Sequence, residues 1–150
     1  MRLNRILLRK GYTIIKLTKI NTNHFEFKAT LNGVNGQFIL DTGASNSCVD
    51  IHLADKFKLE VKDSETKAAG AGAIDIETKI SSKNKLQIND WKFLNCHIVL
   101  LDLTHVNTAL IEHKAEAVDG IMGADILEKG EAIIDYSNRL LYLKKLVYKY

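Results

Sequence analysis

The residues best suited to chemistry in this 150-residue chain are Asp41-Thr42-Gly43-Ala44, which follow the apolar run Phe38-Ile39-Leu40. A strand over the apolar run would deliver the Asp41 carboxylate out of the core, onto a turn that only small residues fit. Gly43 lets the backbone come close to that carboxylate and offers it an amide donor. A carboxylate held in this way can accept a proton from water. Asp-Thr-Gly after a strand is also a common turn sequence with no catalytic role. The motif alone therefore leaves open whether Asp41 is catalytic or an ordinary turn residue.

A second motif, Ile121-Met122-Gly123, lies about 80 residues further along and runs into Ala124-Asp125-Ile126-Leu127. Two large apolar residues precede a glycine, and the residues after it predict a turn of amphipathic helix. These side chains have no evident chemical role. The structural interpretation is a strand packed closely against a neighbour, with Gly123 making room.

The elements that must position these motifs are mostly short strands. Alternating and β-branched patterns predict strands over residues 14–17, 24–31, 37–40, 74–80, 86–88, 92–93 and 96–101, and a terminal hairpin over 132–136 and 139–143. Asn32-Gly33 and Asn89-Asp90 predict hairpin turns, with residues 34–36 continuing the first turn. Residues 51–58 suit a short helix or a turn, 105–113 suit a short helix, and 124–128 suit a helix that stops at Gly130. We therefore expect one all-β domain over residues 1–150, with one or two short helices.

Composition fits this expectation and excludes several other classes of protein. Hydrophobic residues make up 46% and charged residues 26%, which excludes a disordered or collagen-like chain. No apolar run approaches the length needed to cross a membrane, so no membrane-spanning segment is expected. The N-terminus has no secretory pattern, so we expect a cytoplasmic protein unless a targeting segment was removed. Cys48 and Cys96 are expected to be free, buried thiols in a reducing compartment.

The net charge of +3 is distributed unevenly. Residues 1–25 hold six basic side chains and residues 136–150 hold four, and neither segment has an acidic one. Residues 26–135 carry 11 basic and 18 acidic side chains. The basic ends could meet an anionic partner, either nucleic acid or a membrane surface, or they could be solvated strand edges on which lysine blocks pairing. Because no aromatic interleaving or RNA-binding signature accompanies them, the strand-edge interpretation is favoured and no nucleic-acid partner is expected.

Taken together, the two motifs resemble those of the retropepsin-like (clan AA) aspartic proteases, the single-domain relatives of retroviral protease. In that family an apolar strand ends in Asp-Thr-Gly-Ala or Asp-Ser-Gly-Ala, a glycine-containing flap hairpin follows, and an apolar-apolar-Gly motif leads into a short helix. The corresponding stretches here are Asp41-Thr42-Gly43-Ala44, a flap at 68–73 with Gly70-Ala71-Gly72, and Ile121-Met122-Gly123. The resemblance covers roughly residues 22–143, and the terminal hairpin is similar to the bacterial and retrotransposon-like branch. It implies a retropepsin-like single-lobe acid protease fold, with basic terminal strands outside the core.

The chemistry of this family implies a twofold dimer. Hydrolysing an amide with water needs a base for the water and an acid for the carbonyl oxygen, and two carboxylates that share a proton supply both. Asp41 is the only aspartate followed by Thr-Gly or Ser-Gly, so the second carboxylate would come from a second copy of the chain. The resemblance assigns Thr42 to hydrogen bonds across the axis, Gly43 to orienting the carboxylate, and an extended peptide to the cleft. It requires no cofactor and no metal.

One departure from the family concerns the contact between subunits. Retroviral members often carry an aspartate soon after Asp-Thr-Gly-Ala, paired with an arginine after the second glycine. Ser45 and Ala124 occupy those places here, so both partners of the ion pair are missing together.

Other chemistries have weaker support in the sequence. The histidines form no His-Glu-x-x-His pattern, and Cys96-His97 and Cys48 with His52 are not four-ligand sets, so no metal site is expected. Cys48 is better explained as a small buried hydrophobe than as a nucleophile. Gly70-x-Gly72 lacks the lysine of a phosphate-binding loop. The expected function is therefore an aspartic endopeptidase, and the alternative is a catalytically weak retropepsin-like module for dimerisation or peptide binding.

Overall fold

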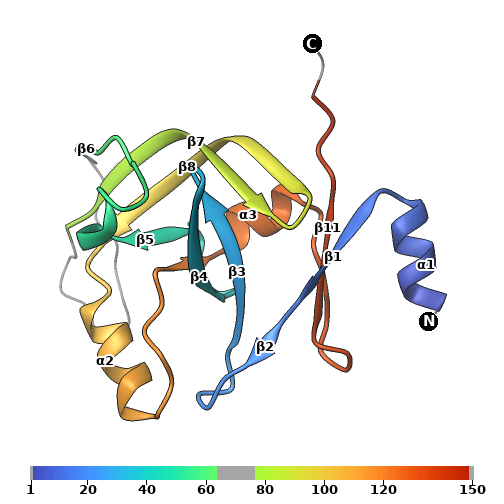
Figure 1. The fold of residues 1–150 in the computed structure, drawn as a ribbon, viewed down its shortest axis with the longest axis horizontal. Helices are drawn as coiled ribbons and strands as arrows, with labels where there is room; N and C mark the ends of the chain where they lie inside the picture. The colour runs from blue at the N-terminus through green and yellow to red at the C-terminus, as the bar shows by residue number, and fades with distance from the viewer. Residues whose placement is uncertain (1, 64–76, 149–150) are drawn as a thin grey trace.

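The computed structural model describes residues 2–63 and 77–148 of the chain (Figure 1). Its elements in chain order are α1 (Arg2–Arg9), β1 (Tyr12–Lys16), β2 (Thr18–Lys19), β3 (Phe25–Leu31), β4 (Val34–Leu40), β5 (Cys48–Asp50), a 3₁₀ turn η1 (Ile51–Leu53), β6 (Lys62–Asp63), β7 (Lys79–Ile88), β8 (Trp91–Leu101), α2 (Thr104–Glu112), β9 (Gly120–Met122), α3 (Ala124–Lys129), β10 (Ile133–Asp135) and β11 (Leu140–Lys144). Strands dominate, so the predicted all-β class with a few short helices is confirmed.

Two sheets make up the fold. The larger sheet has the order β2-β3-β4-β9-β5-β8-β7-β6, and β3 also pairs with β7, so the sheet curls back on itself. The smaller sheet has the order β1-β11-β10, which confirms the predicted terminal hairpin and adds an N-terminal strand to it. The indole N–H of Trp91 donates to the carbonyl oxygen of Lys144 at 2.9 Å and joins the two sheets.

Several predicted boundaries were wrong for identifiable reasons. Asn32 and Gly33 have positive φ angles of 51° and 83°, so they form a two-residue hairpin turn and β4 resumes at once at Val34. Residues 34–36 therefore belong to the strand and not to the turn. The short runs predicted at 86–88, 92–93 and 96–101 belong to two long strands, β7 and β8, joined by the predicted turn at Asn89-Asp90. Of the strand predicted at 74–80, residues 74–76 lie outside the described residues and β7 begins at Lys79.

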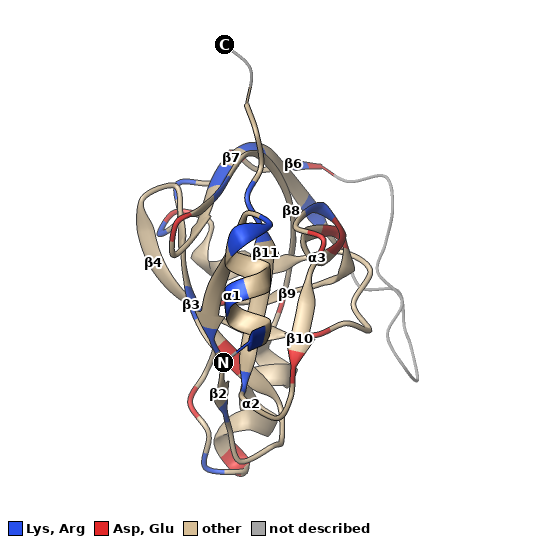
Figure 2. Cartoon of the chain, turned by 90° about the vertical axis from the view of Figure 1, so that its right-hand side faces the viewer, with Lys and Arg blue, Asp and Glu red and all other residues tan. Residues whose placement is uncertain are grey.

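The first part of the basic N-terminal segment, Arg2–Arg9, is a helix and not the expected strand edge, whereas Lys16 and Lys19 lie at exposed positions of the edge strands β1 and β2. α1 lies beside β1, with its arginine positions on the outside of the molecule (Figures 1 and 2). The Leu7 side chain is buried, and the Asn4 side chain accepts a hydrogen bond from the hydroxyl of Tyr142 in β11. Helical spacing of Leu3 and Leu7 was the available signal for this helix.

The core explains why the strand before Asp41 is held firmly. Phe38, Phe57 and Trp91 are among the largest fully buried side chains, and Phe38 packs against Phe57 with ring centroids 6.4 Å apart. The neighbouring Ile39 faces a smaller cluster that includes Leu110 of α2. Each such side chain contributes roughly 1.5–3 kcal/mol when fully buried. β4 is thus packed on both faces immediately before Asp41. Among the described residues, no helix has the length and apolar character needed to cross a membrane.

Candidate active site

Asp41 lies at the point where β4 leaves the sheet. Its backbone N–H donates to the carbonyl oxygen of Met122 at 2.9 Å, which extends the parallel pairing of β4 with β9 by one step. The side chain is half-buried, whereas the three residues before it are buried. The apolar run therefore fixes the backbone of Asp41 and leaves its carboxylate accessible.

The turn after Asp41 holds one carboxylate oxygen in place. The backbone N–H of Gly43 donates to Asp41 Oδ1 at 2.9 Å, and the N–H of Ala44 donates to the Asp41 carbonyl oxygen at 3.2 Å. Thr42 and Gly43 are exposed. The arrangement orients the carboxylate with a donor from its own turn, and places the Thr42 side chain at the surface where another molecule can reach it.

The second motif packs directly against this turn. Leu40 and Met122 are paired in the β4–β9 register, and the N–H of Ala124 donates to the Ala44 carbonyl oxygen at 2.7 Å. A Cβ atom on Gly123 would lie 2.5 Å from that same oxygen, which is shorter than the contacts that Cβ atoms make in proteins. Glycine at this position lets the two motifs touch backbone to backbone. The structure thus brings together Asp41-Thr42-Gly43-Ala44 and Ile121-Met122-Gly123.

A buried hydrogen-bond network that the sequence analysis missed locks the two motifs together. Ser47 Oγ donates to Asp125 Oδ1 at 2.7 Å and accepts from the Gly123 N–H at 2.8 Å. The Ser47 N–H also donates to both Asp125 oxygens, at 2.9 and 3.0 Å. This network ties the segment that follows Asp41-Thr42-Gly43-Ala44 to the first turn of α3. Ser45 is exposed and Ala124 is half-buried, and neither side chain takes part in the network. The available signal was an acidic residue in the first turn of a helix that follows a glycine.

A pocket of about 620 Å³ opens beside Asp41. Its apolar lining comes from β4, β9 and α2, and its polar rim comes from the loop between β2 and β3 and from the end of α2. The lining residues are Asn21, Thr22, Asn23, His24, Ile39, Asp41, Val106, Ala109, Leu110, His113 and Ile121. His113 Nδ1 donates to the carbonyl oxygen of Ala109 at 2.8 Å. The helix predicted at 105–113 is therefore one wall of the pocket, a role that its sequence did not indicate.

Thr42 opens onto a different hollow of about 350 Å³. Its walls are formed by α3 and the segment that follows, with Ala124, Leu127 and Ile134 supplying apolar surface and Glu128 and Glu131 supplying carboxylates. Asp41 and Thr42 are consecutive residues, yet they face separate concave surfaces.

The predicted flap lies outside the residues that the structure describes. Gly70, Ala71 and Gly72 lie outside the described residues, as does the rest of the stretch 68–73.

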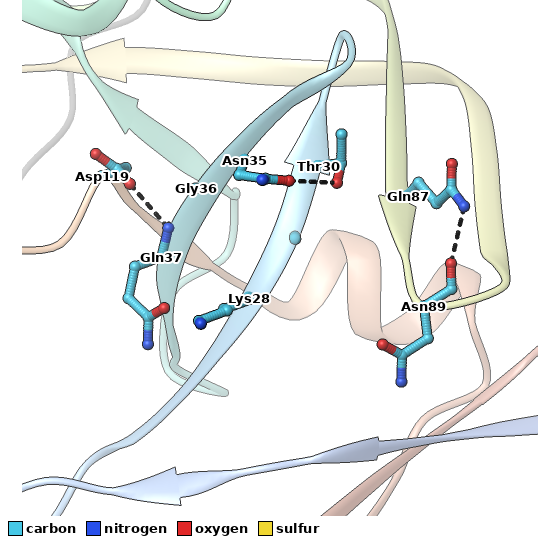
Figure 3. A pocket seen from close by; sticks show the side chains of 9 residues that line it. Lys28, Thr30, Asn35, Gly36, Gln37, Gln87, Asn89 and Asp119 are labelled. Carbon is cyan, nitrogen blue, oxygen red and sulfur yellow. Dashed lines mark hydrogen bonds between the residues drawn. The ribbon is translucent and has the colours of Figure 1, made fainter.

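A third pocket, of about 480 Å³, contains no residue of either motif (Figure 3). It lies over the β3–β4 hairpin and is lined by polar side chains such as Lys28, Asn35 and Gln87. Asp119, at its edge, accepts a hydrogen bond from the Gln37 N–H at 2.8 Å and lies 3.3 Å from Lys56 Nζ. This carboxylate is therefore already paired, whereas within residues 2–63 and 77–148 the second carboxylate oxygen of Asp41 has no hydrogen-bond partner.

One group of possible metal ligands occurs among the described residues, although the sequence predicted no metal site. Donor atoms of Asp50, His52 and Asp102 lie within 4.8 Å of one another. Asp50 Oδ1 accepts from the His52 N–H at 3.2 Å, and Asp102 Oδ1 accepts from the Thr104 N–H at 2.8 Å. The Asp50 side chain caps η1, and Asp102 accepts hydrogen bonds from both the backbone N–H and the hydroxyl of Thr104. The positions of both aspartates are therefore explained without an ion.

The two thiols are poorly placed for nucleophilic chemistry. Cys48 and Cys96 are both free and buried, as predicted. Burial raises the pKa of Cys48 to about 11 and that of Cys96 to about 12. Both are therefore protonated at neutral pH, and the thiol form is a weak nucleophile.

Comparison with known proteins agrees with this geometry. The model of a family described as "Aspartyl protease" matches residues 27–126. A retropepsin-like aspartic protease from Rickettsia conorii is similar in structure, with a TM-score of 0.57 and 21% identity over 89% of this chain and 90% of that one. EIAV protease in complex with the inhibitor HBY-793 has a TM-score of 0.56 and 18% identity, over 73% of this chain and 90% of that one. The retroviral protease-like domain of Ddi1 from Leishmania major has a TM-score of 0.51 and 15% identity, over 89% and 94% of the two chains. No curated protein sequence matches the chain.

Proposed function

Because this chain belongs to the aspartyl protease family and has a retropepsin-like fold, we propose that it is an aspartic endopeptidase with Asp41 as its catalytic residue. The observation that carries the proposal is the Asp41 carboxylate, held on one side by the Gly43 N–H and open on the other to a pocket of about 620 Å³. A side chain oriented by backbone and accessible to a ligand suits proton transfer to and from water.

We further propose that the active species is a homodimer. The chain has a single Asp-Thr-Gly motif, and peptide hydrolysis by this chemistry needs two carboxylates. The exposure of Thr42 and the hollow beside it support a second copy at this face. In the dimer the two Asp41 side chains would meet at the twofold axis, with Thr42 bonding across it.

The proposed reaction divides acid and base roles between the two Asp41 side chains. The ionised carboxylate accepts a proton from a water molecule, and the resulting hydroxide adds to the peptide carbonyl carbon. The protonated carboxyl gives its proton to the carbonyl oxygen, which yields a tetrahedral diol. The carboxyl that took the proton from water then gives it to the amide nitrogen, and the other carboxylate takes a proton from a diol hydroxyl. The C–N bond breaks and releases an amine and a carboxylic acid. Because two facing carboxylates repel when both are ionised, cleavage should be fastest on the acid side of neutrality.

The pocket beside Asp41 supports an extended peptide as substrate. Ile39, Ile121 and Leu110 line it and suit a large apolar side chain next to the bond that is cut. The peptide backbone would add as a strand along the cleft, with its side chains alternating in and out.

The test is cleavage of a peptide library by the wild type and by Asp41→Asn. The substitution keeps the size of the side chain and removes the ionisable carboxyl, so cleavage should be abolished while the fold is kept. Asp55→Asn is the matched control, because Asp55 is exposed and lines neither the pocket beside Asp41 nor the hollow beside Thr42. Cleavage by Asp41→Asn at the wild-type rate would place the chemistry elsewhere. Tight binding of a statine-type analogue without any cleavage by the wild type would instead indicate the peptide-binding alternative.

A further inference from the structure

The outer face of α1 carries an unpaired basic stripe that the proposed proteolysis does not use. Arg2, Arg5 and Arg9 recur at spacings of three and four, so they lie on one face of the helix. All three are exposed, and the ion pairs found among the described residues include none of them. Figure 2 looks onto this face and shows the basic positions of α1 near the centre of the view.

Exposed apolar side chains lie next to the stripe, although polar side chains are favoured on a surface that faces water. Leu3 is 38% exposed, Ile6 is 51% exposed and Leu8 is 53% exposed. α1 therefore presents cationic and aliphatic groups side by side. A surface of phosphates alone would satisfy the arginines and leave these aliphatic groups in water, whereas a lipid bilayer accepts both at the level of its headgroups.

The helix is anchored firmly enough to present this face in a fixed orientation. Leu7 is buried, and Asn4 is hydrogen-bonded to Tyr142. At its end, the Gly11 N–H donates to the Leu8 carbonyl oxygen at 3.1 Å, and the Gly11 carbonyl oxygen accepts from the Lys145 N–H at 2.9 Å. Because Gly11 has a φ of +88°, the chain turns sharply from α1 into β1.

We propose that α1 docks the protein on an anionic lipid bilayer, with Arg2, Arg5 and Arg9 at the phosphates and Leu3, Ile6 and Leu8 between the headgroups. The charge distribution sets the orientation, because residues 26–135 carry 18 acidic and 11 basic side chains and are repelled by the same surface. The α1 side then faces the bilayer. This docking does not depend on proteolysis.

The test is cosedimentation of the full chain with phosphatidylcholine vesicles, with and without phosphatidylglycerol. We expect binding only when phosphatidylglycerol is present, and weaker binding as salt is raised. Each basic residue near an anionic surface contributes about fivefold, so the Arg5→Gln/Arg9→Gln double variant should bind roughly 25-fold more weakly. Lys28→Gln/Lys85→Gln is the matched control, because it removes the same charge from exposed positions on β3 and β7. Its affinity should remain close to that of the wild type.

A second variant and two other partners distinguish the bilayer from competing explanations. Ile6→Ser/Leu8→Ser should weaken vesicle binding several-fold, whereas contact with phosphates alone would not need these side chains. Urea midpoints equal to that of the wild type would show that the variants are folded. The proposal would be overturned if the double arginine variant bound the vesicles as tightly as the double lysine variant. It would also be overturned if the wild type did not bind phosphatidylglycerol vesicles. Tighter binding to duplex DNA than to the vesicles at the same salt would indicate a nucleic-acid partner and overturn the proposal. A tenfold change in the dimer dissociation constant of the arginine variant without lipid would indicate that α1 contacts a second copy of the chain, and would overturn it as well.

Discussion

Replacing Ser47 with alanine should destabilise the fold by about 3 kcal/mol, although Ser47 is buried and does not line the pocket beside Asp41. Its hydroxyl is buried and makes two hydrogen bonds, one to Asp125 Oδ1 at 2.7 Å and one from the Gly123 N–H at 2.8 Å. The substitution removes both bonds and adds no atom that could clash.

The size of the effect follows from what each partner retains. Asp125 keeps donors from the backbone N–H groups of Ser47 and Ile126, so its carboxylate stays bonded. The Gly123 N–H loses its only partner in this network, and a buried unpaired donor costs roughly 1–3 kcal/mol. The lost bond to a charged acceptor adds roughly 1.5–3 kcal/mol. For a chain of this size, a loss of about 3 kcal/mol lowers the melting temperature by roughly 6–12 °C.

The assay is urea unfolding of the wild type, Ser47→Ala and the control Ser45→Ala. Ser45 lies two residues earlier in the same loop and is exposed, so its substitution should change stability by less than roughly 0.5 kcal/mol. Asp125→Ala completes a double-mutant cycle with Ser47→Ala, and the two should be coupled by roughly 0.5–3 kcal/mol. Additive effects, or equal midpoints for Ser47→Ala and Ser45→Ala, would refute the idea that this network holds the two motifs together.

The remaining predictions concern single contacts. Gly123→Ala should cost roughly 1–3 kcal/mol in urea unfolding, because its Cβ would lie 2.5 Å from the Ala44 carbonyl oxygen; an unchanged midpoint would contradict the close approach. Burial raises the pKa of the Glu26 carboxyl, so the folded chain holds this proton more tightly than the unfolded chain. Wild-type stability should therefore fall relative to Glu26→Gln as pH rises through that raised pKa, and parallel urea midpoints across pH would contradict this. Cys48 and Cys96, with pKa values raised by burial to about 11 and about 12, should react with a thiol reagent at neutral pH only after unfolding; rapid reaction of the native chain would show them accessible.

The parts of the site that sequence predicts are those set by neighbours along the chain. Phe38-Ile39-Leu40 followed by Asp41 and small residues indicates a buried strand that ends in a turn, and the Gly43 N–H indeed lies 2.9 Å from the carboxylate. The same local logic predicts the helix after Gly123. A two-residue turn at Asn32-Gly33 could also have indicated that β4 resumes at Val34, because such turns leave no room for a longer connection.

Contacts between distant segments could not be predicted in this way. Ser47 and Asp125 are 78 residues apart, and neither is unusual in its own stretch of sequence. The role of α2 as a pocket wall depends on how it packs over Ile39, which no local pattern specifies. α1 was missed because four basic residues within residues 1–10 suggested a solvated edge, although Leu3 and Leu7 have helical spacing.

The parallel pairing of β4 with β9 also determines when the site can form. Leu40 pairs with Met122, and Thr13 in β1 pairs with Leu143 in β11, so both sheets join the early part of the chain to its late part. Such non-local pairings fold slowly, because a long loop must close before any contact compensates for the lost entropy. A chain still being synthesised contains Asp41 long before it contains the strand to which the Asp41 backbone bonds. The floor of the site is therefore absent until β9 has been made, so the Asp41 backbone in a nascent chain lacks its hydrogen bond to Met122.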